Sequence, residues 1–259
     1  MIADAGATKT DWRLVSSDSH PCKKITGGIN LSVNRTDNDI SDAYRAMAAE
    51  LDISFDDVSV VWYYGAGLTS VSKCETVAGI LSGIFSHAEI HVDNDLVGAS
   101  RAVLGASSGI ACILGTGANS CEWNGEKIIG HVNAGGYVLG DEGSGAYMGR
   151  LLLSDYIKGL VPDVIGSVLS NEYGLTYENI VNHVYRGERP SGYLASFVPL
   201  ISRYSELPYC RALVSDAFDA FLSRNIFPYG RSSAKLAFVG SIAMVFREIL
   251  SERVKNAGY

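Results

Sequence analysis

The sequence is poor in basic residues. Its 259 residues include 21 Lys and Arg against 28 Asp and Glu, which gives a formal net charge of −7. A protein that binds nucleic acid or anionic lipid needs a basic surface, so this composition argues against both kinds of partner. Hydrophobic residues make up 47% and charged residues 19% of the chain, which is typical of a well-packed globular protein.

Long apolar segments are also missing. No uninterrupted apolar run approaches the roughly 20 residues that a membrane-spanning helix needs. Asp4 interrupts the first residues, and the apolar stretch before it is too short for the core of a signal peptide. We therefore expect a cytoplasmic protein that does not associate with membranes.

Cysteine and histidine patterns give no sign of a metal site or of disulfides. The cysteines are odd in number, and no pair has C-x-x-C spacing, so we expect reduced thiols: Cys22, Cys74, Cys112, Cys121 and Cys210. The histidines form no ligand cluster either. His131 is the one that merits attention, because it lies shortly before a glycine-rich stretch around Asp141.

Strand and helix patterns alternate along the chain, which predicts an α/β fold with buried sheets. A polar glycine turn at 4–10 separates the first two strands. Apolar runs predict strands at 1–3, 12–15, 23–30, 58–64, 88–92, 110–114 and 236–239. Helical spacing predicts helices at 39–51, 71–85, 95–103, 242–255 and, with breaks, across 148–227.

Two glycine turns resemble each other at a constant offset of 111 residues. Residues 2–12 and 113–123 align without gaps, and Ile, Gly, Ala and Trp coincide. Both segments read as strand, turn and strand. A duplicated module is the better interpretation of this match, and it predicts two domains, at residues 1–102 and 103–259.

The first turn, Asp4–Thr10, has the composition of an anion-binding loop. Gly6 lets the backbone approach a ligand closely, while successive N–H groups and hydroxyls can line a phosphate. A carboxylate such as Asp4 suits a bridging Mg²⁺, which binds few protein ligands and keeps its water. The alternative is an ordinary polar hairpin. Neither a P-loop nor a G-x-G-x-x-G fingerprint occurs in the chain.

Two further glycine segments strengthen the phosphate interpretation. Gly115–Ser120 forms the second turn, and a pair of opposed hairpins could clamp a polyphosphate in a cleft between domains. Gly240 lies where the strand at 236–239 leads into a helix, a place where backbone N–H groups and a flat base can meet. Gly240 alone is a weak indication, because glycine there also suits plain helix packing.

In this order, the three segments resemble the phosphate-1, phosphate-2 and adenosine motifs of the actin/hexokinase/heat-shock-chaperone superfamily. The stretch GGYVLGDEGSG at 135–145 resembles that of the N-acetylglucosamine kinase branch, which is grouped with the BadF/BadG-type ATPases. The resemblance extends from residue 1 to about 259. It implies two ribonuclease H-like (actin-like ATPase) domains with ATP in the cleft between them.

The resemblance also implies roles for particular residues. ATP would contact Gly6, Thr8, Lys9, Thr10, Thr116, Gly117, Gly240 and Ser241. A sugar would contact Asn30, Asp95, Ala118, Asn119, Gly135, Gly136 and Asp141. Asp4 would lie near Mg²⁺, and Asp95 would be the general base that accepts the proton of a sugar hydroxyl.

Alternative readings of these acidic residues stay open. Asp93 is a rival base only two residues before Asp95, and Asp93 or Asn94 could instead cap the following helix. Glu142 could contact the sugar, or Glu142 and Ser144 could hydrogen-bond within a glycine turn without a catalytic task.

The sequence departs from the family pattern in places. Many N-acetylglucosamine kinases carry Trp in the glycine-rich stretch where this chain has Tyr137, which weakens inference about an N-acetyl pocket. The zinc-binding cysteine cluster of repressor-like sugar kinases is absent, which disfavours that branch. Members of the superfamily normally continue beyond the position of Tyr259 with another strand and helix.

The leading hypothesis is a kinase that uses ATP and Mg²⁺ to phosphorylate N-acetylglucosamine or a related hexosamine on its 6-hydroxyl. Its partner is then a small-molecule sugar, and a homodimer is left open. Two other classes compete with it. One is an ATPase that activates a dehydratase or reductase through an iron–sulfur cluster, and the other is an ATP- or sugar-binding module without chemistry.

Overall fold

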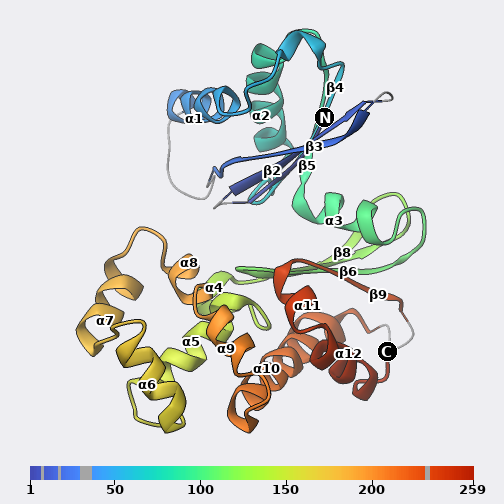
Figure 1. Ribbon diagram of the computed structural model, residues 1–259. Coiled ribbons are helices and arrows are strands. Elements are labelled where there is room, and N and C mark those ends of the chain that lie inside the picture. The colour runs from blue at the N-terminus through green and yellow to red at the C-terminus, as the bar shows by residue number, and fades with distance from the viewer. Residues whose placement is uncertain (7–8, 17–18, 30–36, 231–233) are drawn as a thin grey trace. The chain divides into compact units, whose positions relative to one another are not determined.

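The computed structural model in Figure 1 describes residues 1–6, 9–16, 19–29, 37–230 and 234–259. The chain forms two compact units, Met1–Gly98 and Ala99–Tyr259. Helix α3 (Asp95–Val103) runs through the point of division, and the boundary predicted after residue 102 falls in the same helix. Within the described ranges, no helix has the length and apolar character that crossing a membrane requires.

The first unit contains a mixed sheet with the strand order β3-β2-β1-β4-β5. The three strands β1, β4 and β5 are parallel, while β2 and β3 complete an antiparallel meander. The strands are β1 (Ile2–Ala5), β2 (Lys9–Ser16), β3 (Ser19–Gly27), β4 (Val60–Gly65) and β5 (Glu89–Asn94). The helices are α1 (Asp37–Ala49), the short η1 (Phe55–Asp57), α2 (Val71–Ile84) and the start of α3.

Strand alternation decides which face of the first sheet is buried. Ala3 and Ala5 are buried, whereas Ile2 and Asp4 are exposed, as the period of two along a strand requires. The buried face packs around Trp12, which is fully buried and whose indole N–H donates to the Thr26 hydroxyl at 2.9 Å. The polar indole group is thereby satisfied inside the core.

The second unit contains a smaller sheet with the order β8-β7-β6-β9, and Figure 1 shows the helices of this unit gathered beside it. Its strands are β6 (Gly109–Leu114), β7 (Ala118–Trp123), β8 (Ile128–Val132) and β9 (Leu236–Val239). Its helices are α4 (Gly136–Leu139), α5 (Gly145–Tyr156), α6 (Asp163–Asn171), α7 (Tyr177–Arg186), α8 (Pro190–Ala195), α9 (Val198–Arg203), α10 (Pro208–Phe221), the π-helical turn η2 (Leu222–Ile226), η3 (Phe227–Tyr229), α11 (Ser241–Val245) and α12 (Arg247–Asn256).

The two sheets repeat one topology. In each, an antiparallel meander of three strands (β3-β2-β1 or β8-β7-β6) continues with a parallel strand, β4 or β9. The residue match is different from the predicted one. In the two hairpins Ala5 pairs with Thr10 and Leu114 pairs with Ala118, so the ends of β1 and β6 are offset by 109 residues and their partners by 108. The paired strands therefore do not follow the predicted offset of 111.

Several predicted elements change at their edges. Asp4 lies inside β1 rather than in the turn, because its backbone pairs with Asp11 on one side and Tyr64 on the other. Strand β8 was not predicted from the sequence. The helix predicted at 242–255 is divided into α11 and α12 at Phe246, whose ring is buried and anchors the break.

Candidate active site

Acidic side chains meet where the parallel strands of the first unit end. Ala5 of β1 pairs with Gly65 of β4, and Gly65 pairs with Asn94 of β5, so the three strands finish at one edge. Asp4 lies one residue before this edge and Asp95 directly after it. Ligands of open α/β sheets bind at the carboxyl ends of the strands, so this edge is the candidate reaction site of the first unit.

Asp95 has a partly buried carboxylate at the start of α3. It is the first residue of α3, and one of its oxygens accepts the Leu96 N–H at 2.9 Å; the side-chain oxygen of Asn94 accepts the same N–H at 2.8 Å. Burial raises the pKa of Asp95 to about 6, the negative charge of Asp4 adds to the rise, and the Leu96 N–H opposes it. A carboxylate of this kind is a suitable general base near neutral pH.

Asp4 lies among charged neighbours on the outer face of the sheet. Partial desolvation and the charge of Asp11 raise its pKa, while Lys9 lowers it. Asp11 is itself neutralised by Lys23 at 2.7 Å and Arg13 at 3.2 Å. A cation bound at Asp4 would offset the charge of its own carboxylate, so this residue fits a role beside Mg²⁺.

The structure describes only some of the residues predicted as ligand contacts in the first unit. Thr8 and Asn30 lie outside the described residues. Lys9 is exposed at the start of β2. Thr10 is buried, and its hydroxyl donates to the sulfur of Met47 at 3.5 Å. The hydroxyl of Thr10 therefore lies in the core and is not brought to the strand edge.

In the second unit, helix α5 holds the second glycine turn, Gly115–Gly117. The N–H groups at the start of α5 donate to this turn, Gly145 to the carbonyl of Gly115 at 2.8 Å and Ala146 to that of Thr116 at 3.0 Å. Ser144 caps the helix by accepting the Tyr147 N–H at 3.1 Å. The glycine-rich stretch thus fixes the shape of the turn that precedes β7.

Asp141 is built into the same loop. Its φ of 55° is in the left-handed region, its N–H donates to the carbonyl of Ala134 at 3.0 Å, and its carboxylate accepts the Ala118 N–H at 3.2 Å. A Cβ at Gly117 would lie 3.0 Å from the other carboxylate oxygen, so glycine leaves room for Asp141. Burial raises the pKa of Asp141 to about 6; the Ala118 N–H opposes the rise, and the charge of Glu142 adds to it.

A buried polar network holds Glu142, the residue that follows Asp141. Glu142 accepts the side-chain N–H of Asn225 at 3.2 Å, and Arg224 lies 3.6 Å from its other oxygen. The carbonyl of Asn225 accepts the Ser120 hydroxyl at 3.0 Å. Asn225 lies in η2, and π-helical turns are frequent at functional sites. Sequence reasoning placed Ser120 in the second turn but predicted neither its contact with Asn225 nor a role for Asn225, because nothing in their local pattern indicates a partner about 80 or more residues away.

The third glycine segment lies beside the second. Gly240 has φ of 107°, and a Cβ there would overlap the carbonyl oxygen of Leu114, the last residue of β6. Ser241 begins α11. The segment borders a hollow of about 580 Å³ whose lining is mainly apolar: Leu236, Phe238, Val239, Gly240, Ala243, Met244, Arg247, Leu250, Ser251 and Val254. The second unit therefore brings two of the three predicted nucleotide segments together.

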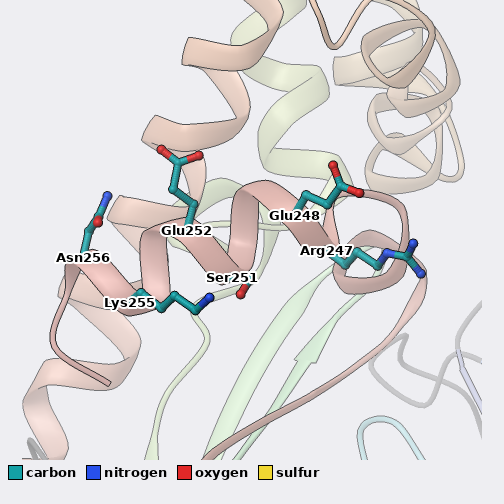
Figure 2. Close-up of a pocket in the computed structure, with 6 residues that line it drawn as sticks. All are labelled: Arg247, Glu248, Ser251, Glu252, Lys255 and Asn256. Carbon is teal, nitrogen blue, oxygen red and sulfur yellow. The ribbon is translucent and has the colours of Figure 1, made fainter.

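A neighbouring hollow of about 670 Å³ follows α12, as Figure 2 shows. Its lining is mostly charged or polar: Arg247, Glu248, Ser251, Glu252, Lys255 and Asn256. Glu252 is paired with Arg211 at 2.6 Å. None of these residues was predicted as part of the site, and the charged lining is typical of a solvated helix face.

Metal and cysteine chemistry are limited in the described chain. Among the described residues, no three His, Cys, Asp or Glu side chains are grouped so that they could hold a metal. The five cysteines are thiols that are not joined in disulfides, and Cys112 and Cys121 are both buried. A magnesium ion at Asp4 would depend on phosphate and water for its remaining ligands.

Comparisons with solved structures show the fold. A structure from Chromobacterium violaceum, titled "Putative N-acetylglucosamine Kinase", has 19% identity and a TM-score of 0.71 over 98% of this chain and 91% of its own. A ROK family glucokinase from Streptomyces griseus, in complex with glucose and AMPPNP, has 16% identity and a TM-score of 0.56 over 98% and 86%. The fold is therefore the two-sheet α/β fold of actin-like ATPases and sugar kinases, as predicted.

A third structure identifies the family. The "Putative N-acetylglucosamine Kinase" of Porphyromonas gingivalis is 40% identical over 99% of this chain and 91% of its own, with a TM-score of 0.93. The chain belongs to the family of this protein. No protein-family model and no curated protein matches the chain, and membership among the BadF/BadG-type ATPases stays a prediction.

Proposed function

We propose that the protein is an ATP-dependent kinase that phosphorylates N-acetylglucosamine or a related hexosamine on its 6-hydroxyl. The observation that carries the proposal is Asp95: a carboxylate with a pKa raised to about 6 at the carboxyl edge of parallel strands. The 40% identity with the Porphyromonas gingivalis protein supports the sugar assignment.

Asp95 acts as the general base in this proposal. A sugar hydroxyl is a poor nucleophile, and Asp95 orients it and accepts its proton as the hydroxyl oxygen bonds to the γ-phosphorus. The bond between the γ-phosphorus and the bridging oxygen breaks, and ADP leaves with that oxygen. Because its pKa is about 6, Asp95 is roughly nine-tenths ionised at pH 7 and ready to accept a proton.

Asp4 is the proposed contact for Mg²⁺. Its carboxylate is accessible on the sheet, and the nearby charge of Asp11 helps to raise its pKa, which suits a divalent cation held partly through water. When bound, Mg²⁺ would neutralise the charge that develops on the phosphates.

The remaining predicted residues divide between nucleotide and sugar. For the nucleotide we propose Gly6, Thr8, Lys9, Thr10, Thr116, Gly117, Gly240 and Ser241. The buried hydroxyl of Thr10 leaves only its backbone for such a contact. The buried carboxylate of Asp141 can accept a hydrogen bond from a sugar hydroxyl. For the sugar we propose Asn30, Asp95, Ala118, Asn119, Gly135, Gly136 and Asp141.

A coupled assay of ADP release tests the substrate. We expect N-acetylglucosamine to stimulate ADP release above the basal rate more than glucosamine, N-acetylmannosamine, N-acetylmuramate or glucose. The 6-phosphate is the expected product by nuclear magnetic resonance (NMR). If none of the five sugars raises the rate above basal, the proposed function is wrong.

A further inference from the structure

Asn119 and His131 form a cross-strand pair in the second unit. His131 of β8 pairs in register with Cys121 of β7, so Asn119 is its diagonal neighbour on the same face. The Nε2 atom of His131 lies 3.0 Å from the side-chain oxygen of Asn119. His131 is exposed, so this contact is accessible from solvent.

A second contact fixes which way the Asn119 amide points. The backbone N–H of Ser120 donates to the side-chain oxygen of Asn119 at 3.0 Å. A backbone N–H can only donate, so the atom that it contacts must be the carbonyl oxygen and not the amide nitrogen. The same oxygen faces His131, and therefore Nε2 of His131 must carry the proton and donate as well.

Two donors thus occupy the oxygen of Asn119 and leave its NH₂ group for a ligand. The adjacent Ala118 N–H is bound to the carboxylate of Asp141 at 3.2 Å. The side-chain NH₂ group of Asn119 is a donor, and it lies one residue after Ala118, whose N–H holds the acceptor Asp141. A polyhydroxylated ligand can satisfy both kinds of group at once.

We propose that His131 is a positioning residue that holds Asn119 with its NH₂ group towards the sugar, so that Asn119 donates to an oxygen of the substrate. This inference depends on the proposed function and adds a requirement on the substrate, which must offer an acceptor oxygen to the NH₂ group of Asn119. Without His131, the Asn119 side chain keeps only the Ser120 contact and samples other rotamers.

Steady-state kinetics of three variants test the role. Loss of one positioning hydrogen bond in His131→Ala should raise the KM for the sugar about three- to tenfold, with kcat and the KM for ATP unchanged. His131→Gln keeps a side-chain N–H donor and should recover most of the lost affinity. Asn119→Asp retains the accepting oxygen but loses the NH₂ group, and should raise the sugar KM at least as much as His131→Ala.

The matched control is His20→Ala, which removes another exposed histidine, in β3 of the other unit, and should leave the sugar KM unchanged. The proposal is overturned if His131→Ala behaves like the unmodified protein. It is also overturned if His131→Gln is as impaired as His131→Ala, or if the change falls on kcat or on the KM for ATP.

The tautomer of His131 gives a readout that needs no enzyme activity. Nitrogen-15 NMR of the imidazole should show the proton on Nε2 in the unmodified protein, and Asn119→Leu should shift that resonance. A proton on Nδ1 would contradict the hydrogen bond. If no sugar is phosphorylated but Nε2 carries the proton, the proposed function fails while the Asn119–His131 pair stands as a structural contact only, and the positioning role is withdrawn.

Discussion

At the scale of single residues, Asp95 and Asp141 have similar electrostatic surroundings. Burial raises the pKa of each to about 6, and an acidic neighbour (Asp4 or Glu142) adds to the rise. Backbone N–H groups oppose the rise, those of Leu96 and Asp95 for Asp95 and that of Ala118 for Asp141. The hydrogen bonds of the two carboxylates suit different roles. Asp141 is bound to the loop through the Ala118 N–H, which suits the fixed sugar contact that we propose. Asp95 accepts backbone N–H groups at the start of its own helix, which suits its proposed role as the base.

Asp95→Asn should abolish most turnover while leaving ATP binding intact. The amide keeps the size of the side chain but cannot accept the hydroxyl proton, so kcat should fall about 10²- to 10⁴-fold. ATP affinity, measured by calorimetry, should be unchanged. Asp93→Asn is the matched control, since it changes the rival base two residues away. A larger loss of kcat in Asp93→Asn than in Asp95→Asn would reverse the assignment.

The pH dependence should report the raised pKa of Asp95. A base is active when ionised, so kcat/KM should be level above pH about 6 and fall about tenfold per pH unit below it. The stability of the folded state changes with pH in the opposite direction. The folded protein takes up this proton near pH 6 and the unfolded chain nearer 4, so protonating Asp95 favours the folded state as the pH falls between these values.

The measurement is a pH–rate profile together with chemical denaturation at pH 7 and at pH 4. Asp95→Asn removes the buried charge, and it should therefore be more stable than the unmodified protein at pH 7 and lose that advantage towards pH 4. A profile that stays level down to pH 4.5 would show that no group with a pKa near 6 is needed for turnover.

At the scale of elements, the shape of the second glycine turn, which we propose binds nucleotide, depends on backbone packing between β6, α5 and α11. The start of α5 donates to the turn after β6, and Gly240 lies against the last carbonyl of β6. These contacts are made by backbone atoms. Side-chain substitutions in the turn should therefore disturb its shape less than substitutions of the glycines that permit the close approach.

Gly240→Ala tests this packing. Alanine at φ of 107° is strained, and its Cβ would overlap the Leu114 carbonyl oxygen, so the variant should lose more than about 2 kcal/mol of stability and bind ATP more weakly. Gly105→Ala is the control: its φ of 57° is also positive, but a Cβ there meets no atom within 4 Å, and the expected loss is about 1 kcal/mol. Equal losses of stability in the two variants would contradict the account of Gly240.

Local patterns predicted much of this architecture, but they did not predict its long-range contacts. The strand before Asp95 and the strands that end at Gly65 and Leu114 follow from apolar runs and glycine turns, which are local features. The place of Asp4 inside β1 depends on pairing with β4, and the hydrogen bond between Glu142 and Asn225 joins residues 83 apart. Sequence reasoning therefore predicted the strands and their limits better than the long-range contacts between them.

The same limit explains the error in the internal repeat. The offset of 111 aligns identical residues, such as Gly6 with Gly117 and Trp12 with Trp123. Strand register depends on pairing across each hairpin, which a linear match does not contain. The pairs Ala5–Thr10 and Leu114–Ala118 give offsets of 109 and 108 instead.

At the scale of the whole molecule, each unit has a core of its own. The buried cluster of the first unit includes Trp12, Leu81 and Phe85, and that of the second includes Leu169 and Phe218, with no residue in common. Two separate cores mean that the units can lose structure independently, so unfolding of the chain should depart from a single two-state transition.

Cavity substitutions in each core test this independence. Leu81→Ala and Leu169→Ala each remove a fully buried side chain and should cost about 2–5 kcal/mol in their own unit. Hydrogen exchange followed by mass spectrometry should show faster exchange of β1 and β4 in Leu81→Ala, with β6 and β7 unchanged, and the reverse pattern in Leu169→Ala. Equal acceleration of all four strands by either substitution would mean a single cooperative unit.

Transfer of the γ-phosphate is the central claim, and a label follows it directly. Incubating the protein with γ-labelled ATP, Mg²⁺ and N-acetylglucosamine should place the label on the 6-oxygen of the sugar in the unmodified protein, with little released as free phosphate, and should give almost no labelled sugar with Asp95→Asn. Label released as phosphate at the same rate with or without sugar would indicate an ATPase, and bound but unconverted ATP would indicate a binding module. Either result would contradict the proposed kinase.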